Sequence, residues 1–213
     1  MNNVVYTVHL MNDPKKEDSL TLELLEAIDD KSDLTQRHLA DRMGVALGLA
    51  NSYLKRCVRK GLVKIHQAPA NRYLYYLTPK GFAEKSRLTG KFLFSSLDFY
   101  RKASLAYTRI FNQCYSSGIE KVCLCGMSEL AEIASLRAQE FDLKILEIFD
   151  PFASVDRFLG VPVRNKLERS DVLDAYVFTA LNQPEIVYKQ LKSLSGEKQL
   201  FMPDFFYHIT KVD

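Results

Sequence analysis

The sequence predicts an α/β protein of two domains joined by a long helix, and three observations support this prediction. Up to residue 90, helical periodicity leads into a single pair of short β-prone runs. Farther along, apolar side chains recur at spacings of three and four, as on one long amphipathic helix. In the last part, short apolar runs alternate with helical segments, which is typical of a parallel, three-layer α/β domain. The expected parts are a flexible arm (1–16), a helical domain with a hairpin (17–90), a linking helix (91–118) and an α/β domain (119–213).

The composition is that of an ordinary globular protein. Hydrophobic residues make up 47% and charged residues 26% of the 213 residues. No apolar run approaches the roughly 20 residues of a membrane-spanning helix, and the first residues lack the pattern of a signal peptide. The four cysteines and four histidines show no metal-ligand spacing. We therefore expect buried free thiols, no metal site, no membrane contact and a cytoplasmic location.

Residues 34–61 carry the pattern of two helices separated by a tight turn. Thr35 is a suitable N-cap for the first helix, because its hydroxyl can accept from a free N–H of the first turn. Gly44 ends that helix, since glycine adopts the left-handed conformation at little cost. A second helix is expected at 47–60, and Gly61 ends it in the same way.

A β-hairpin follows the second helix. Two β-prone runs, 62–67 and 73–78, flank a turn at 68–71. A further helix is expected at 79–88, broken at Thr89-Gly90 before the linking helix begins. Two helices followed by a hairpin are the layout of a winged helix–turn–helix domain, whose second helix enters the major groove of DNA.

Positive charge is concentrated in this unit. Between residues 51 and 91, ten Lys and Arg residues stand against one acid, Glu84, a local charge of +9 in a chain of formal net charge +3. A basic recognition helix and wing favour phosphate binding. The alternative is a winged helix used for protein contacts, with a solvated basic face. The candidate DNA contacts are Gln36 and Arg37 on the first helix, Gly48, Asn51, Ser52, Lys55 and Arg56 on the second, and Arg72 on the wing.

The region from about residue 20 to 110 resembles the MarR-type winged helices, most of all the exopolysaccharide-associated transcriptional regulators. The stretches that carry the resemblance are LTQR at 34–37, GV at 44–45, LG at 47–48, KG at 60–61 and YYLTPKG at 75–81. It implies a regulator of polysaccharide biosynthesis genes that binds double-stranded DNA. One departure is Ala46, where such domains usually have a serine that caps the recognition helix, and the loss of this cap costs about 1 kcal/mol.

The linking helix has an apolar side that needs a partner. It could pack on its own domain or pair with the same helix of a second copy. Because two half-sites multiply DNA affinity and fix their own spacing, a homodimer fits a DNA-binding function. We therefore expect a homodimer, with this helix as its interface.

The second half of the chain alternates strands with helices. The expected strands are 122–125, 143–149, 174–181 and 199–202, the expected helices are 130–139 and 184–194, and the segment 158–163 follows a loop. The turn after the first strand places Gly126, Ser128 and Ala131 at the three small-residue positions of a dinucleotide fingerprint. Ser128 carries a side chain where the fingerprint has glycine. Asp150, at the end of the second strand, is suitably placed to bind a ribose hydroxyl.

Residues from 121 to about 194 resemble the small Rossmann-like domains of sugar O-acetyltransferases, and the pairing with a winged helix is similar to Rex-type redox repressors. The stretches GMSELAEIA, the strand ending in FD, and GVPV carry this resemblance. It implies a small-molecule effector, with NAD(H) or a nucleotide sugar as the candidates. The candidate ligand-binding residues are Gly126, Met127, Ser128, Glu129 and Asp150.

Two further interpretations of this domain stay open. It could have lost its ligand and serve as a docking module, which would suit a non-catalytic scaffold of a polysaccharide assembly system. Catalysis is not expected, because the sequence shows no Ser/His/Asp order, no paired-acid motif and no cluster of metal ligands. We therefore predict a DNA-binding regulator that is not an enzyme and has no catalytic residues.

Overall fold

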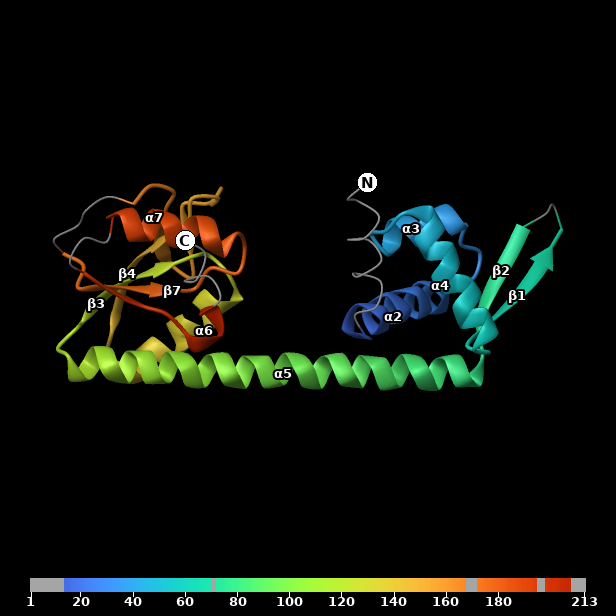
Figure 1. The fold of residues 1–213 in the computed structure, drawn as a ribbon, viewed down its shortest axis with the longest axis horizontal. Helices are drawn as coiled ribbons and strands as arrows, with labels where there is room; N and C mark the ends of the chain where they lie inside the picture. The colour runs from blue at the N-terminus through green and yellow to red at the C-terminus, as the bar shows by residue number, and fades with distance from the viewer. Residues whose placement is uncertain (1–13, 70–71, 168–171, 195–197, 208–213) are drawn as a thin grey trace. The chain divides into compact units, whose positions relative to one another are not determined.

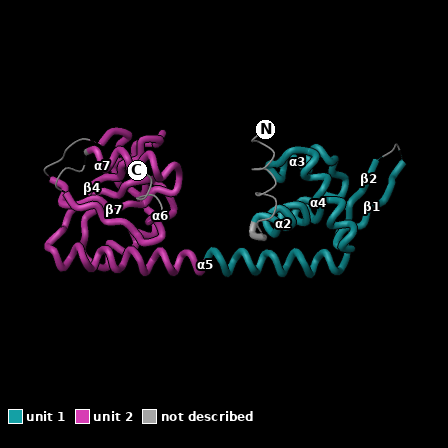
Figure 2. The backbone as a smooth tube through the Cα atoms, in the orientation of Figure 1, with its two compact units in different colours: residues 1–96 teal, residues 97–213 magenta. Residues whose placement is uncertain are grey.

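A computed structural model describes residues 14–69, 72–167, 172–194 and 198–207 (Figure 1). Most of the predicted flexible arm and the tip of the predicted hairpin turn lie outside these residues. The chain divides into two compact units, residues 1–96 and 97–213 (Figure 2). None of the described helices is both long enough and apolar enough to cross a membrane.

The first unit is a winged helix–turn–helix domain. Its helices are α2 (Pro14–Asp30), α3 (Gln36–Arg42), α4 (Leu47–Arg59) and the first half of α5 (Pro79–Ser116), and its strands are β1 (Val63–Ala68) and β2 (Arg72–Leu77). Thr35 caps α3 as predicted, accepting from the His38 N–H at 3.1 Å. Gly44 and Gly61 have φ angles of 59° and 69°, which confirms their role as left-handed helix ends. Ala46 makes no side-chain cap at α4.

The base of the wing is tied to the start of α5. The Thr78 hydroxyl donates to the Gly61 carbonyl at 2.6 Å and accepts from the Gly81 N–H at 3.0 Å. A side chain at Gly81 would place its Cβ 2.1 Å from the backbone oxygen of Leu62. Glycine is therefore required here, because α5 begins in direct contact with the chain that enters β1.

Helix α5 is continuous from Pro79 to Ser116, so the predicted break at Thr89-Gly90 is wrong. A glycine in the interior of a helix costs about 1 kcal/mol relative to alanine, which is too little to interrupt 38 residues of otherwise regular helix. The Thr89 hydroxyl also bonds back to the Lys85 carbonyl at 2.9 Å, one turn earlier in the same helix.

The second unit is built on a six-stranded sheet with the strand order β5-β6-β4-β3-β7-β8. The strands are β3 (Lys121–Cys125), β4 (Lys144–Phe149), β5 (Arg157–Phe158), β6 (Val161–Arg164), β7 (Ala175–Phe178) and β8 (Gln199–Phe201), and the helices are α6 (Glu129–Ala138) and α7 (Pro184–Leu194). Single 3-10 turns lie at Gln139–Phe141 and Asp204–Phe206. All pairings are parallel except that of β5 with β6.

Helices cover both faces of this sheet. The chain moves from β3 to β4 on one side and from β7 to β8 on the other, so right-handed crossovers place α6 and α7 on opposite faces (Figure 1). The second half of α5 also packs on the sheet, with Tyr107, Phe111 and Cys114 fully buried in the core. The Tyr107 hydroxyl donates to the Phe178 carbonyl at 2.9 Å, and burial raises the pKa of this phenol well above its ordinary value. The predicted fold class is confirmed.

The four cysteines are buried free thiols, as predicted. Burial raises the pKa of Cys57 and of Cys114 to about 11, so both are protonated at neutral pH.

Candidate nucleic-acid interface

Helix α4 has one buried and one exposed face. Ala50, Tyr53, Leu54 and Cys57 are buried and hold the helix on the core of the first unit. Gly48, Ser52, Lys55 and Arg59 are exposed on the other side, and Asn51 is half-buried between the two faces. The second helix of the motif is thus anchored by an apolar face and presents a polar face to solvent, as DNA recognition requires.

An open groove of about 780 Å³ runs between α3, α4 and β1. Four of the eight predicted DNA contacts line it, namely Gln36, Asn51, Ser52 and Lys55, together with Leu54, Val58, Arg59 and Ile65. The Ser52 hydroxyl donates to the Gly48 carbonyl at 2.9 Å. The buried Oδ1 of Asn51 has no hydrogen-bond partner among the described residues. The structure therefore gathers the polar candidates of two helices in one groove.

A second hollow of about 400 Å³ brings the wing to the start of α3. Arg72 and Tyr73 of β2 line it with Thr35 and Gln36. The Tyr75 N–H donates to the Ser32 carbonyl at 2.9 Å and ties β2 to the turn before α3. Arg72 and Gln36 therefore line the same hollow, whereas Arg37 lies on the exposed side of α3.

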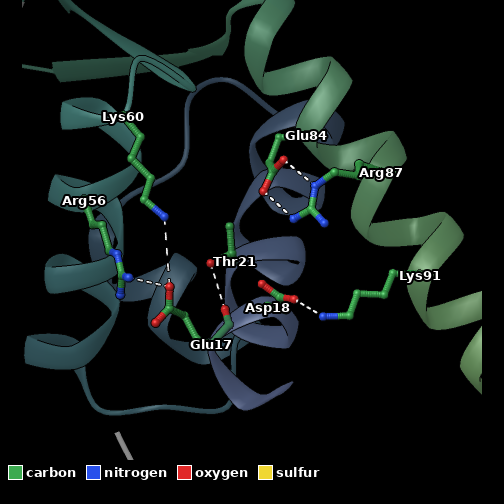
Figure 3. A network of polar contacts seen from close by, with 8 residues as sticks. All are labelled: Glu17, Asp18, Thr21, Arg56, Lys60, Glu84, Arg87 and Lys91. Carbon is green, nitrogen blue, oxygen red and sulfur yellow. Dashed lines mark hydrogen bonds and ion pairs between the residues drawn. The ribbon is translucent and has the colours of Figure 1, made fainter. Parts of the chain in front are cut away.

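About half of the basic residues in this region are neutralised within the domain. Figure 3 shows Glu17 of α2 paired with Arg56 and, at 4.0 Å, with Lys60. It also shows Asp18 paired with Lys91 at 2.6 Å. These contacts join α2 to α4 and α5 and neutralise cations on the α2 side, so the unpaired positive charge of α4 lies on its exposed face.

Two further pairs lie along the first half of α5. Asp29 pairs with Lys85, and the hydrogen bond that Lys85 donates to this carboxylate raises the pKa of Lys85. Glu84 accepts two hydrogen bonds from Arg87, both at 2.8 Å, which lower the pKa of Glu84 (Figure 3). The charge of +9 counted between residues 51 and 91 therefore overestimates the positive charge that is available to DNA.

Arg56 departs from its predicted place. It was expected beside Asn51 and Lys55 on the DNA side, but it lies on the α2 side of the helix and is held by Glu17. The reason is helical geometry, because residues 55 and 56 differ by about 100° around the axis. We therefore remove Arg56 from the candidate contacts.

On α3, α4 and the wing, five exposed basic side chains have no ion pair to any described residue: Arg37, Lys55, Arg59, Lys64 and Arg72. We call them the five unpaired cations. Lys80, at the start of α5, has no ion pair either, but its Nζ donates to the Lys60 carbonyl at 2.9 Å. Arg59 and Lys64 were counted in the basic region but not chosen as contacts. Spacing could have identified Arg59, which lies one turn beyond Lys55 on the same face.

In the predicted ligand site of the second unit, the polar groups already form hydrogen bonds with one another and with neighbouring backbone groups. Asp150 is only 8% exposed, and its carboxylate accepts from the Met127 N–H at 2.7 Å and the Phe152 N–H at 2.8 Å. Ser128 caps α6, accepting from the Leu130 N–H at 3.1 Å and donating to the Thr179 carbonyl at 2.5 Å.

Gly126 serves the packing of the sheet. It has a φ angle of 113°, and a Cβ there would lie 2.2 Å from the Cα of Ala180. Glu129 is exposed at the start of α6. The turn therefore brings Gly126, Met127, Ser128 and Asp150 together. Met127, Ser128 and Asp150, however, form their hydrogen bonds with other groups of the protein. The N–H of Met127, which the fingerprint would offer to a phosphate, is already bound to a carboxylate.

Comparison with known proteins agrees with the winged helix–turn–helix fold of the first unit. A family model described as winged helix-turn-helix DNA-binding matches residues 17–64. No curated protein matches the chain significantly. Among solved structures, the PcaV transcriptional regulator from Streptomyces coelicolor is similar at 24% identity and a TM-score of 0.35, over 38% of this chain and 60% of that one. MarR from E. coli is similar at 22% identity and a TM-score of 0.31, over 41% of this chain and 73% of that one.

A different class aligns over more of the chain. Human N-acetylserotonin methyltransferase, solved in complex with SAM, is similar at 11% identity and a TM-score of 0.32, over 81% of this chain and 68% of that one. An alignment of this extent with an enzyme contradicts the prediction that the chain is not an enzyme, and we withdraw that prediction. At this TM-score the likeness assigns no activity to the chain.

Proposed function

We propose that this chain is a MarR-type transcriptional regulator that binds double-stranded DNA through α4 and the wing. The observation that carries the proposal is the separation of charge within the first unit. Acids of α2 and α5 pair with Arg56, Lys60, Lys85, Arg87 and Lys91. The five unpaired cations lie on α3, α4 and the wing, and two of them, Lys55 and Arg59, line the groove that holds Asn51.

This arrangement suits the polyanionic backbone of DNA. Phosphate contacts position a protein on the duplex, and polar side chains on the recognition helix read the bases. The unpaired cations supply the first kind of contact, and Gln36, Asn51 and Ser52 supply the second. A winged helix used only for protein contacts has no need of five exposed, unpaired cations on α3, α4 and the wing.

The proposal includes a homodimer that pairs through α5. Leu93 and Phe94 are 57% and 72% exposed, and Leu97, Tyr100 and Leu105 are exposed farther along the same helix. Burying such side chains against a second copy removes apolar surface from water at about 25 cal/mol per Å². Two copies also place two recognition helices on one duplex, which multiplies affinity.

The target genes enter the proposal through the sequence resemblance. Promoters of polysaccharide biosynthesis genes are the first duplexes to test, because the LTQR and YYLTPKG stretches resemble the exopolysaccharide-associated regulators. A nucleotide effector is not part of the proposal. Asp150 already binds the Met127 N–H, so a phosphate at this turn would have to displace a buried carboxylate.

The test is fluorescence anisotropy of labelled duplex from upstream of the neighbouring gene cluster, with the full chain at low salt. The variant Lys55→Glu/Arg72→Glu should lose at least 100-fold in affinity, because two phosphate contacts per subunit become repulsive. The matched control is Lys144→Glu/Lys189→Glu, which makes the same change of charge at exposed positions of the second unit. Equal losses in the two double variants would contradict the proposed interface.

A further inference from the structure

One exposed apolar side chain lies on the polar face of α4. Leu47 is the first residue of the helix and is 43% exposed. It is not among the apolar side chains packed on the core of the first unit, which include its neighbours Val45 and Leu49. Exposure of a single leucine needs no explanation by itself, but its place on the helix does.

Leu47 lies in line with the side chains of the groove. Leu47, Asn51 and Lys55 are each four residues apart, so they form one row along the surface of α4. Asn51 and Lys55 both line the open groove. In a recognition helix the N-terminal residues reach deepest into the major groove, which makes Leu47 the first side chain of this row to meet the bases.

The first turn of α4 offers no polar side chain. Residues 46–50 are Ala, Leu, Gly, Leu and Ala. Gly48 is exposed with no heavy atom within 4 Å of the place where a Cβ would lie. Ala46 is exposed and gives no cap. A helix that begins in this way cannot donate or accept a side-chain hydrogen bond at its tip, so any base contact made there by a side chain must be apolar.

Only one base edge in the major groove carries an apolar group. Thymine presents its 5-methyl group there, whereas the other bases present hydrogen-bond donors and acceptors. We propose that Leu47 reads the 5-methyl group of a thymine and thereby selects an A·T pair at the tip of the recognition helix. This inference rests on the proposed DNA-binding function and names the determinant of its specificity.

The surroundings favour this partner over a protein surface. Gln36, Lys55 and Arg59 line the groove that follows Leu47 along α4, together with Leu54, Val58 and Ile65, of which only Ile65 is largely exposed. Protein-binding sites on soluble proteins gather several apolar side chains into one patch. A thymine methyl, flanked by phosphates, matches an exposed leucine on a helix that also carries the unpaired Lys55 and Arg59.

The experiment removes the methyl group and leaves the rest of the base intact. Duplexes that bind the full chain are selected from a random pool, and the consensus is resynthesised with each thymine replaced in turn by deoxyuridine. At one position in each half-site, this replacement should weaken binding of the wild type by about fourfold, the value expected for one buried methyl group. Substitution in both half-sites should weaken binding by about sixteenfold.

The variant Leu47→Ala should bind the thymine and deoxyuridine duplexes equally at that position. The matched control Leu181→Ala, at an exposed leucine of the second unit, should keep the wild-type preference. The wild-type scan alone tests the proposal if Leu47→Ala does not fold. Sequence-specific binding with no methyl-sensitive position would overturn the inference and leave the proposed function intact. A methyl effect that persists in Leu47→Ala would also overturn it, whereas no binding to any duplex would overturn both.

Discussion

Replacing Lys55 by Gln tests whether the unpaired cations, rather than all basic residues of the region, bind DNA. Each phosphate contact contributes about 0.9 to the slope of log K against log salt concentration. Five cations in each of two subunits give an upper bound of about 9 for this slope. Lys55→Gln removes one contact per subunit, so the slope should fall by about 1.8 and the affinity at 0.1 M salt by about 60-fold.

The matched variant is Lys85→Gln, which removes the same charge from a lysine paired with Asp29. It should leave the slope unchanged and cost about 1 kcal/mol or less in stability, as partly exposed ion pairs do. Both variants are titrated by fluorescence anisotropy on one duplex between 50 and 300 mM salt. Equal changes of slope would refute the reasoning, because the ion pairs would then have no part in deciding which cations contact DNA.

Three further predictions concern the fold. Gly81→Ala should lower the free energy of unfolding by about 2 kcal/mol or more, because the new Cβ would meet the Leu62 carbonyl. Gly90→Ala should raise the free energy of unfolding by up to about 1 kcal/mol, because a Cβ there meets no other atom and alanine favours a helix. Urea unfolding measures both variants, and equal stabilities would disprove the close contact at Gly81. The N–H groups of Glu120 and Lys121 lower the pKa of Asp174, so its stabilising effect is present above the ordinary pKa and is lost as pH falls through the lowered value. Urea unfolding at pH 6 and pH 3 should therefore show a smaller acid loss in Asp174→Asn than in the wild type, and identical losses would contradict this. With pKa values of about 11, Cys57 and Cys114 should react with iodoacetamide at pH 8 roughly a hundredfold more slowly than a free thiol; fast labelling of the folded protein would show that these thiols are accessible.

Local signals in the sequence were enough to predict the winged helix–turn–helix domain. Gly44 and Gly61 end their helices because their backbone must turn left-handed there. Thr35 caps α3 through a contact within three residues. Such features depend on near neighbours alone, and the alternation of strands and helices in the second unit was equally visible. The pairing of β5 with β6 was not predicted, because the sequence showed only a segment after a loop at 158–163.

The distribution of charge could not be predicted in the same way. Glu17 and Arg56 are far apart in the sequence, and they meet only because α2 packs against α4. A count of basic residues cannot separate paired from unpaired cations, since the partners come from another element. Among the basic residues, Lys55 and Arg72 therefore remain candidate DNA contacts, Arg56 is removed, and Arg59 and Lys64 are added.

The ligand prediction shows a second limit. Gly126 and Asp150 do lie at the ends of neighbouring strands, as their positions in the sequence implied. The direction of the Asp150 carboxylate could not be inferred, because it depends on the Met127 and Phe152 N–H groups that surround it. A fingerprint of small residues predicts a tight turn and does not show whether its N–H groups are free.

The most direct test of the central claim is binding of the wild-type chain to duplex DNA, compared with a scrambled duplex of the same length. We expect tighter binding to the promoter duplex, by at least 100-fold at 0.1 M salt, and a steep fall in affinity as salt rises. Equal affinity for both duplexes would show only non-specific attraction. Absence of binding at low salt would contradict the claim that the face formed by α4 and the wing contacts DNA.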